Sequence, residues 1–209
     1  MKSFDRESEI RRGRRLEYLT IAWNSLEGLI AVAAGLLAGS IALVGFGIDS
    51  AIEVSSGAAL LWRLSLDMGS HRREELEAKT LRLVGISFLA LAAYVGIDAV
   101  LALLKQKTPS PSYVGIALAA LSLIVMPILA RAKRGVAARI SSRALHADSR
   151  QTDICAYLSA ILLGGLLLNA LFGWWWSDPV AALIMTPIIA KEGIEALRGE
   201  TCCDDPGPK

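Results

Sequence analysis

The chain has 209 residues, of which 54% are hydrophobic and 20% charged, with a mean hydropathy of +0.47 and a formal net charge of +2. This composition excludes an ordinary soluble domain, which is less apolar, and also a uniformly apolar chain, which carries fewer charges. The charges must therefore be segregated along the sequence, and the small net charge gives no indication of a nucleic-acid partner.

Six apolar stretches follow a basic segment at 1–17, and each is near the ~20 residues that cross a bilayer core. The basic segment is not a signal peptide, because it mixes acids with bases and precedes a long apolar run without a small-residue cleavage site. We therefore expect an all-α, polytopic membrane protein with a six-helix transmembrane domain at 18–197. A short tail at 198–209 contains Cys202 and Cys203 and is expected to be disordered. The expected spans are 18–39, 41–62, 82–104, 112–131, 151–173 and 178–197.

Lysine and arginine fall almost entirely on one side of these spans. Of the 22, all but Lys105 and Lys107 precede the first span, lie in 63–82 or 131–150, or follow residue 190. This bias predicts basic loops on the inner side, both termini in the cytoplasm, and a location in the plasma membrane. Trp174 to Trp176 then lie on the outer side, where we expect an interfacial aromatic anchor.

Acidic residues inside the spans are the strongest functional signal, because an ionisable residue in a membrane helix is energetically costly. No lysine or arginine lies near the middle of any span to neutralise them. Uncompensated carboxylates must be protonated or must share a cation. The pattern therefore predicts a proton-coupled metal site, in which the same groups hold either protons or a divalent ion. The acids are Glu27, Asp49, Glu53, Asp98 and Asp153, with Asp148 at the mouth of the fifth span.

Helical spacing groups these acids into two half-sites. Asp49 and Glu53 are four residues apart, so both project from one face of the second span. Asp153 lies roughly 140° away from Asp148 around the fifth helix. If spans two and five face each other, two carboxylates from one and a carboxylate with an amide or thiol from the other enclose one divalent ion. The polar stripe of the fifth span consists of Asp148, Gln151, Thr152, Cys155 and Ser159.

Two acidic residues have two interpretations each. Glu27, three residues after Asn24, either faces the same cavity or forms an interhelical hydrogen bond. Asp98 is either functional or only paired with the hydroxyl of Tyr94, four residues earlier.

The half-site on the second span carries a family resemblance. Residues 39–53, "GSIALVGFGIDSAIE", resemble the second-helix signature of the cation diffusion facilitator family, in which a Gly-Ser turn and an Ala-Leu pair precede two ligands four residues apart. Asn24 with the following "AAGLLAGS" is similar to the family's first helix, and residues 143–185 are similar to its fifth and sixth helices. The chain looks closest to a short form without the cytoplasmic C-terminal domain, the transmembrane-163-like branch, which is linked to zinc efflux.

The resemblance implies a divalent metal transporter that exports Zn²⁺ or a similar transition metal in exchange for protons. It implies a homodimer in the lipid bilayer, no enzymatic activity, and no tightly bound cofactor apart from the transported ion. Asp49 and Glu53 match the two ligands of the second helix. On the fifth helix, one alignment places Gln151 and Cys155 at the ligand positions, and another places Ser149 and Asp153 there. Neither alignment supplies the family's histidine, which weakens a preference for zinc.

Two other function classes fit the same residues less well. A non-transporting membrane metal buffer, sensor or accessory subunit would use the same ligands without turnover. An intramembrane enzyme fits poorly, because no span carries a nucleophile with a histidine base and no H-E-x-x-H spacing occurs.

Overall fold

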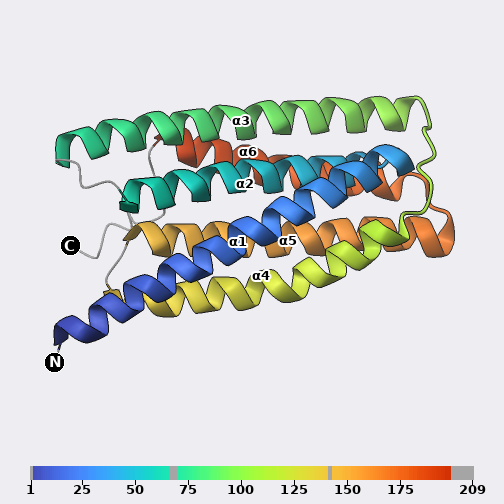
Figure 1. Cartoon of the computed structure of the whole chain (residues 1–209). Coiled ribbons are helices and arrows are strands. Elements are labelled where there is room, and N and C mark those ends of the chain that lie inside the picture. Colours follow the sequence, from blue (N-terminus) through green and yellow to red (C-terminus); the bar gives the residue numbers. More distant parts are fainter. Residues whose placement is uncertain (1, 66–69, 141–142, 199–209) are drawn as a thin grey trace, which may run out of the picture.

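A computed structural model describes residues 2–65, 70–140 and 143–198 (Figure 1). Within these residues the chain is all-α, as predicted, and no strand is present. The tail with Cys202 and Cys203 lies outside the described residues. The helices are α1 (Lys2–Ala38), α2 (Ile41–Ser65), α3 (Ser70–Leu104), α4 (Tyr113–Ile140), α5 (Arg143–Phe172) and α6 (Ser177–Arg198).

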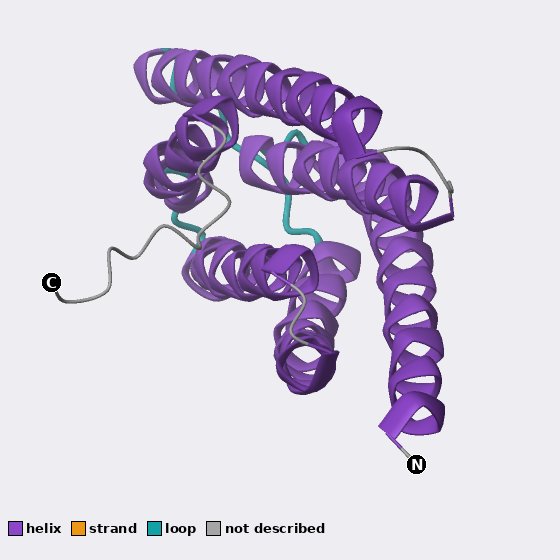
Figure 2. Cartoon of the chain, turned by 90° about the vertical axis from the view of Figure 1, so that its left-hand side faces the viewer, coloured by secondary structure: helices purple, strands orange, loops and turns teal. Residues whose placement is uncertain are grey.

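The helices form an elongated bundle in which successive helices run in opposite directions. The start of α1 and the end of α6 lie at the same end of the bundle (Figure 1). Figure 2 shows the helices nearly end-on, packed side by side, and α3 and α6 are neighbours (Figure 1). Helix α2 contacts α1, α3, α5 and α6. The helix that carries Asp49 and Glu53 is therefore the central one.

Five helices are long and apolar enough to cross a membrane. Such windows occur in α1 to α5, and the most apolar lies in α4, at a mean hydropathy of 2.3. Helix α6 forms where the sixth span is expected, but it carries Asp178 in its first turn and Lys191, Glu192 and Glu195 near its end. By length and composition, the described residues thus contain five clear spans and one more polar helix.

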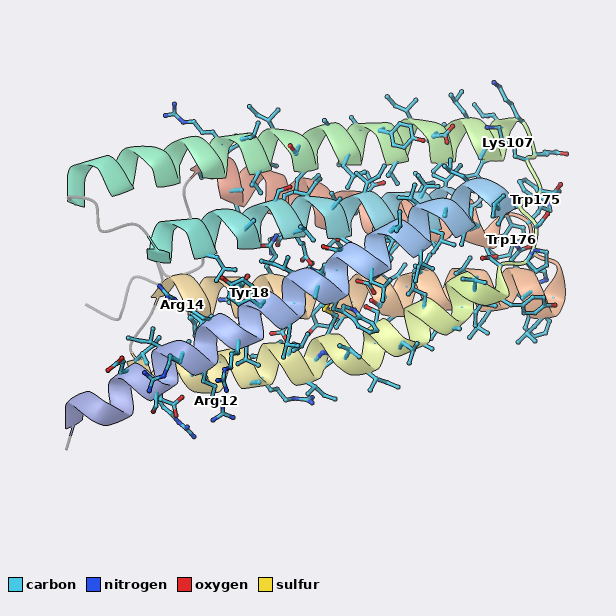
Figure 3. All side chains as sticks on the ribbon, in the orientation of Figure 1. Arg12, Arg14, Tyr18, Lys107, Trp175 and Trp176 are labelled. Atoms are coloured by element: carbon cyan, nitrogen blue, oxygen red, sulfur yellow. The ribbon has the colours of Figure 1, made fainter. Side chains whose placement is uncertain are left out.

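The basic segments expected as connections are largely helical. Helices α1, α3 and α5 begin well before their apolar windows, and α4 continues to Ile140. The bilayer fixes only the length of the apolar part, and arginine, glutamate, leucine and alanine are good helix formers beyond it. The two ends of the bundle differ in chemistry: Arg12 and Arg14 lie toward one end, whereas Trp175 and Trp176 lie at the other (Figure 3). At that second end, the rings of Trp174 and Trp176 stack at 5.1 Å.

The turn between α1 and α2 explains the Gly-Ser pair. Gly39 has φ +69°, a left-handed conformation that glycine adopts without steric cost and that commonly ends a helix. The Ser40 N–H then donates to the Gly35 carbonyl at 2.9 Å, which closes the end of α1. The Ser40 hydroxyl accepts the Leu43 N–H at 3.1 Å, which caps the start of α2. One dipeptide therefore ends one helix and begins the next.

Asp178, near the start of α6, holds the connection between α1 and α2 in place. Its buried carboxylate accepts the Ile41 N–H at 2.9 Å and a hydrogen bond from the Ser40 hydroxyl. An acid at a helix N-terminus satisfies free N–H groups and interacts favourably with the helix dipole. Because the start of α2 is fixed, the depth of every residue along α2 is fixed as well.

Glycines let α1 and α2 approach closely. A Cβ atom added at Gly28 would lie 3.0 Å from the Gly47 carbonyl oxygen, and one added at Gly47 would lie 2.8 Å from the Val32 nitrogen. Small residues of this kind allow membrane helices to pack backbone against backbone. This contact places the polar face of α1 directly against the acidic face of α2.

A buried lysine joins α1, α4 and α5. The side chain of Lys133 is fully buried, and its Nζ lies 3.0 Å from Glu17 Oε2 and 2.6 Å from Asp148 Oδ2. We call Glu17, Lys133 and Asp148 the lysine triad. The assignment of Lys133 to a basic loop is therefore wrong, because α4 extends beyond its apolar part and Lys133 continues the buried face of Met126 and Ala130.

Replacing the buried lysine should destabilise the bundle. Lys133→Met leaves Glu17 and Asp148 buried without a cation, and the expected loss is about 3–5 kcal/mol of unfolding free energy. Unfolding of the purified protein in detergent measures this loss. Lys107→Met is the matched control: Lys107 lies 3.9 Å from Asp98 and its side chain is 55% exposed, so we expect a change below about 1 kcal/mol. Equal stability of the two variants would contradict the structural role of the triad.

Candidate metal centre

Three side chains from α2 and α5 converge inside the bundle. One carboxylate oxygen of Asp49, one of Glu53 and the Cys155 sulfur all lie within 4.8 Å of one another. Asp49 and Cys155 are each 3% exposed, and Glu53 is partly buried. These three residues, the Asp49–Glu53–Cys155 cluster, are the group within the described chain whose spacing suits a metal ion.

Local structure explains the convergence. Asp49 and Glu53 share one face of α2 because they are one helical turn apart. Contact between α2 and α5 brings Cys155 to that face, where its thiol donates a hydrogen bond to Glu53 Oε1. The Cys155 sulfur also lies 4.0 Å from Asp49 Oδ2. Asn24 on α1 donates from Nδ2 to Glu53 Oε2 at 2.6 Å, so the Glu53 carboxylate is oriented from two sides.

The cluster combines two hard oxygen donors with one soft sulfur donor. Among the described ion pairs, none joins a lysine or arginine to Asp49 or Glu53. Buried carboxylates without a cation require a proton or a bound ion. A thiolate with carboxylates suits Zn²⁺, Co²⁺ or Cd²⁺ better than Mg²⁺ or Ca²⁺.

Asp148 and Asp153 do not join this cluster. Asp148 belongs to the lysine triad, at 2.6 Å from Lys133 Nζ. Asp153 pairs with Arg134 of α4, whose NH2 nitrogen lies 2.9 Å and 2.7 Å from its two carboxylate oxygens. Helical geometry separates them from Cys155, because Asp148 is about two turns earlier and Asp153 points toward α4. Each carboxylate is thus paired with a cation of the protein itself.

Gln151 lies between Asp148 and Cys155 along α5. It is partly buried and one helical turn before Cys155, so it shares the face of α5 that carries the cysteine. Of the two half-site alignments, the one through Gln151 and Cys155 therefore brings a residue into the cluster, whereas the one through Ser149 and Asp153 directs its acid to Arg134.

A further polar layer lies one turn along α1 from Asn24. Glu27 is 1% exposed, and Ser50 Oγ lies 3.4 Å from its Oε2. Ser159 donates to Ser122 at 3.0 Å, and both serines are fully buried. The polar residues of α1, α2, α4 and α5 thus form a continuous column, from the lysine triad through the cluster to this serine layer.

The residues with two interpretations have the following partners. Glu27 accepts an interhelical hydrogen bond from the Ser50 hydroxyl at 3.4 Å, and its neighbour Asn24 donates to Glu53 of the cluster. Asp98 lies 3.9 Å from Lys107, so its partner is a lysine of the following loop. Lys133 was missed, although its place three and seven residues after Ala130 and Met126 on one helical face was a detectable signal.

Comparison with known proteins assigns the chain to a family. Residues 18–200 match the model of the cation efflux transmembrane domain. An uncharacterized transporter of Methanocaldococcus jannaschii is 26% identical over 179 residues, which are 83% of this chain and 63% of the relative. An uncharacterized transporter of Synechocystis sp. is 30% identical over 166 residues, which are 74% of this chain and 52% of the relative.

The chain spans about half to two thirds of the length of these relatives. The family match covers nearly all of the described helices, including α2 with its acids and α5 with Cys155. The resemblance seen in the sequence is confirmed at the family level: the chain belongs to the cation efflux family, the cation diffusion facilitators.

Proposed function

We propose that this protein exports a divalent transition metal, with Zn²⁺ as the first candidate, in exchange for protons. The single observation that carries the proposal is the Asp49–Glu53–Cys155 cluster, in which buried oxygen and sulfur donors converge without a lysine or arginine partner among the described residues. We assign the three residues as metal ligands and Gln151, one turn away, as the candidate fourth donor. The ion pairs of Asp148 and Asp153 count against these two residues as ligands in this conformation.

Exchange of metal for protons follows from the chemistry of the donors. A carboxylate or thiolate that binds a proton no longer coordinates a metal strongly, so protons and metal compete for the same atoms. Opening of the cluster alternately to the two sides, by rocking of helix groups, would convert this competition into coupled transport.

Direction and assembly follow from the charge distribution and from the family. The arginine-rich end of the bundle supports both termini in the cytoplasm by the positive-inside rule. We extend this to a transmembrane domain at 18–197 in the plasma membrane, with cytoplasmic segments at 1–17 and 198–209. The family resemblance supports a homodimer, with metal ion and protons as substrates and no enzymatic activity.

Transport and proton coupling are measured together in proteoliposomes. With a metal indicator and a pH indicator inside, addition of Zn²⁺ outside should produce metal entry together with internal alkalinisation, because protons leave as the ion enters. The same assay with Mn²⁺, Co²⁺ and Cd²⁺ ranks the substrates. Saturable binding without metal entry would instead indicate a buffer or sensor, and metal entry at constant internal pH would contradict proton coupling.

Neutralising either acid of α2 should stop transport. Asp49→Asn and Glu53→Gln each remove one negative oxygen ligand while keeping the side-chain shape, and we expect metal entry to fall at least about tenfold. Asp153→Asn is the matched control, because it makes the same change in an acid paired with Arg134. Elution as a single species from a sizing column verifies folding. Near-wild-type rates in the α2 variants would refute the assignment of the cluster.

The thiol should set the preference among metals. Cys155→Ser replaces the sulfur by a hard oxygen at the same position, so Cd²⁺ should lose more affinity than Mn²⁺. We expect the ratio of the Cd²⁺ and Mn²⁺ affinities to fall by about tenfold or more, which corresponds to about 1.4 kcal/mol. Competition between the two ions in the flux assay gives this ratio. An unchanged ratio would mean that the sulfur does not contact the transported ion.

A further inference from the structure

Two buried polar residues of α1, three positions apart, carry side-chain oxygens without a hydrogen-bond partner. Among the described residues, Asn24 Oδ1 and Glu27 Oε1 are both in this state, and each residue is 1% exposed. Almost all buried polar atoms in folded proteins have a partner, so each exception requires an explanation. Both atoms are acceptors. A water molecule or a cation would satisfy two acceptors at once, but only a cation also neutralises the buried Glu27 carboxylate.

The two acceptors lie on one face of α1. They are three residues apart, and this face packs on α2, where the Ser50 hydroxyl lies 3.4 Å from Glu27 Oε2. Ser50 also donates to the Phe46 carbonyl at 3.1 Å, which leaves its oxygen able to accept or coordinate. The Ser122 hydroxyl of α4 faces the Glu27 carboxyl as well. The Trp23 indole N–H also faces this carboxyl, but it only donates and cannot coordinate a cation, so the atoms here that can bind an ion are oxygens.

Asn24, three residues before Glu27 on α1, contacts the cluster, and its amide has one defined orientation. Its Nδ2 donates to Glu53, and the reverse orientation would place the amide oxygen against a carboxylate. The Asn24 oxygen is therefore held away from Glu53. Glu27 is close enough to interact electrostatically with both Asp49 and Glu53. The side-chain oxygens of Asn24 and Glu27 thus lie beside the cluster and are not among its three ligands.

We propose that Asn24, Glu27, Ser50 and Ser122 form a second cation-binding position, made only of oxygen donors, beside the Asp49–Glu53–Cys155 cluster. The proposal rests on the proposed function of the cluster, to which it adds a second place for the transported ion. Its support is geometric: a nine-tenths buried carboxylate and a nine-tenths buried amide on one face of α1 each carry an unpartnered oxygen.

The charges of the two positions fit two divalent ions. When deprotonated, the donors Asp49, Glu53, Glu27 and Cys155 together carry four negative charges, which equal the charge of two divalent cations. Glu192 of α6 is not a donor of either position but adds to the negative field at Asp49. The lysine triad contributes one positive and two negative charges in a separate layer. An oxygen-only position prefers harder ions such as Mn²⁺ or Mg²⁺, whereas the cluster with its thiol prefers softer ones.

Metal stoichiometry with Co²⁺ tests the proposal. Purified, metal-free protein is titrated with Co²⁺; equilibrium dialysis counts bound ions, and the near-ultraviolet thiolate-to-cobalt absorption reports the ion at Cys155. For the wild type we expect about two ions per chain, of which only one produces the absorption. Glu27→Gln should bind about one ion with the absorption intact. Cys155→Ser should lose the absorption and keep the second position.

Glu195→Gln is the matched control, because it makes the same substitution on α6, outside the column, and should bind as the wild type does. If Glu27→Gln does not fold, Ser50→Ala combined with Ser122→Ala removes two donors and keeps the carboxyl. In either variant, we expect the second ion to bind at least about tenfold more weakly.

Three results would overturn the second position. The wild type could bind one ion per chain, Glu27→Gln could lose the sulfur absorption together with the ion, or Glu27→Gln could still bind two ions. Failure of the proposed function is recognised separately, because Asp49→Asn would then transport metal at the wild-type rate whatever the stoichiometry. A wild type that binds no Co²⁺ would overturn both proposals.

Discussion

A charge buried inside a membrane-spanning bundle needs an opposite charge, a proton or a bound ion, and this requirement separates the acids of the chain by role. Asp148 and Glu17 share the ammonium group of Lys133, and Asp153 has the guanidinium of Arg134. Asp49, Glu53 and Glu27 have no such partner among the described residues. Carboxylates that the protein already neutralises hold helices together, whereas those that it leaves uncompensated are available to a transported cation.

The position of the uncompensated acids depends on how α2 is held. Ser40 caps the start of α2, Asp178 of α6 accepts from the same first turn, and Gly28 and Gly47 allow the backbone of α1 to approach. These contacts fix α2 along its axis and bring α1 against its acidic face. The Gly-Ser signature of the family therefore acts on the site at a distance, because it sets where Asp49 and Glu53 lie in the bundle.

Two donor sets of different softness lie next to each other in the polar column. The cluster offers sulfur with two carboxylates, and the neighbouring face of α1 offers an amide oxygen, a carboxylate and hydroxyls. An ion that binds too tightly at one place is not released, so a neighbouring weaker position is useful to a transporter. The absence of histidine from both donor sets, among the described residues, makes the single sulfur the main source of preference for soft metals.

The sequence alone determined the helical class, the acidic pair of α2 and the family, because hydropathy, i to i+4 spacing and a short signature are local properties. It also grouped Asp148, Gln151 and Cys155 on one face of α5 and directed Asp153 elsewhere. It did not determine which of these residues meets α2. Only the packing of α4 against α1 and α5 decided that, since it buries Lys133 beside Asp148 and leaves Cys155 beside Glu53. The pairing of charges from different helices is a property of tertiary structure, because residues that neutralise each other here are as far apart in the sequence as Glu17 and Lys133.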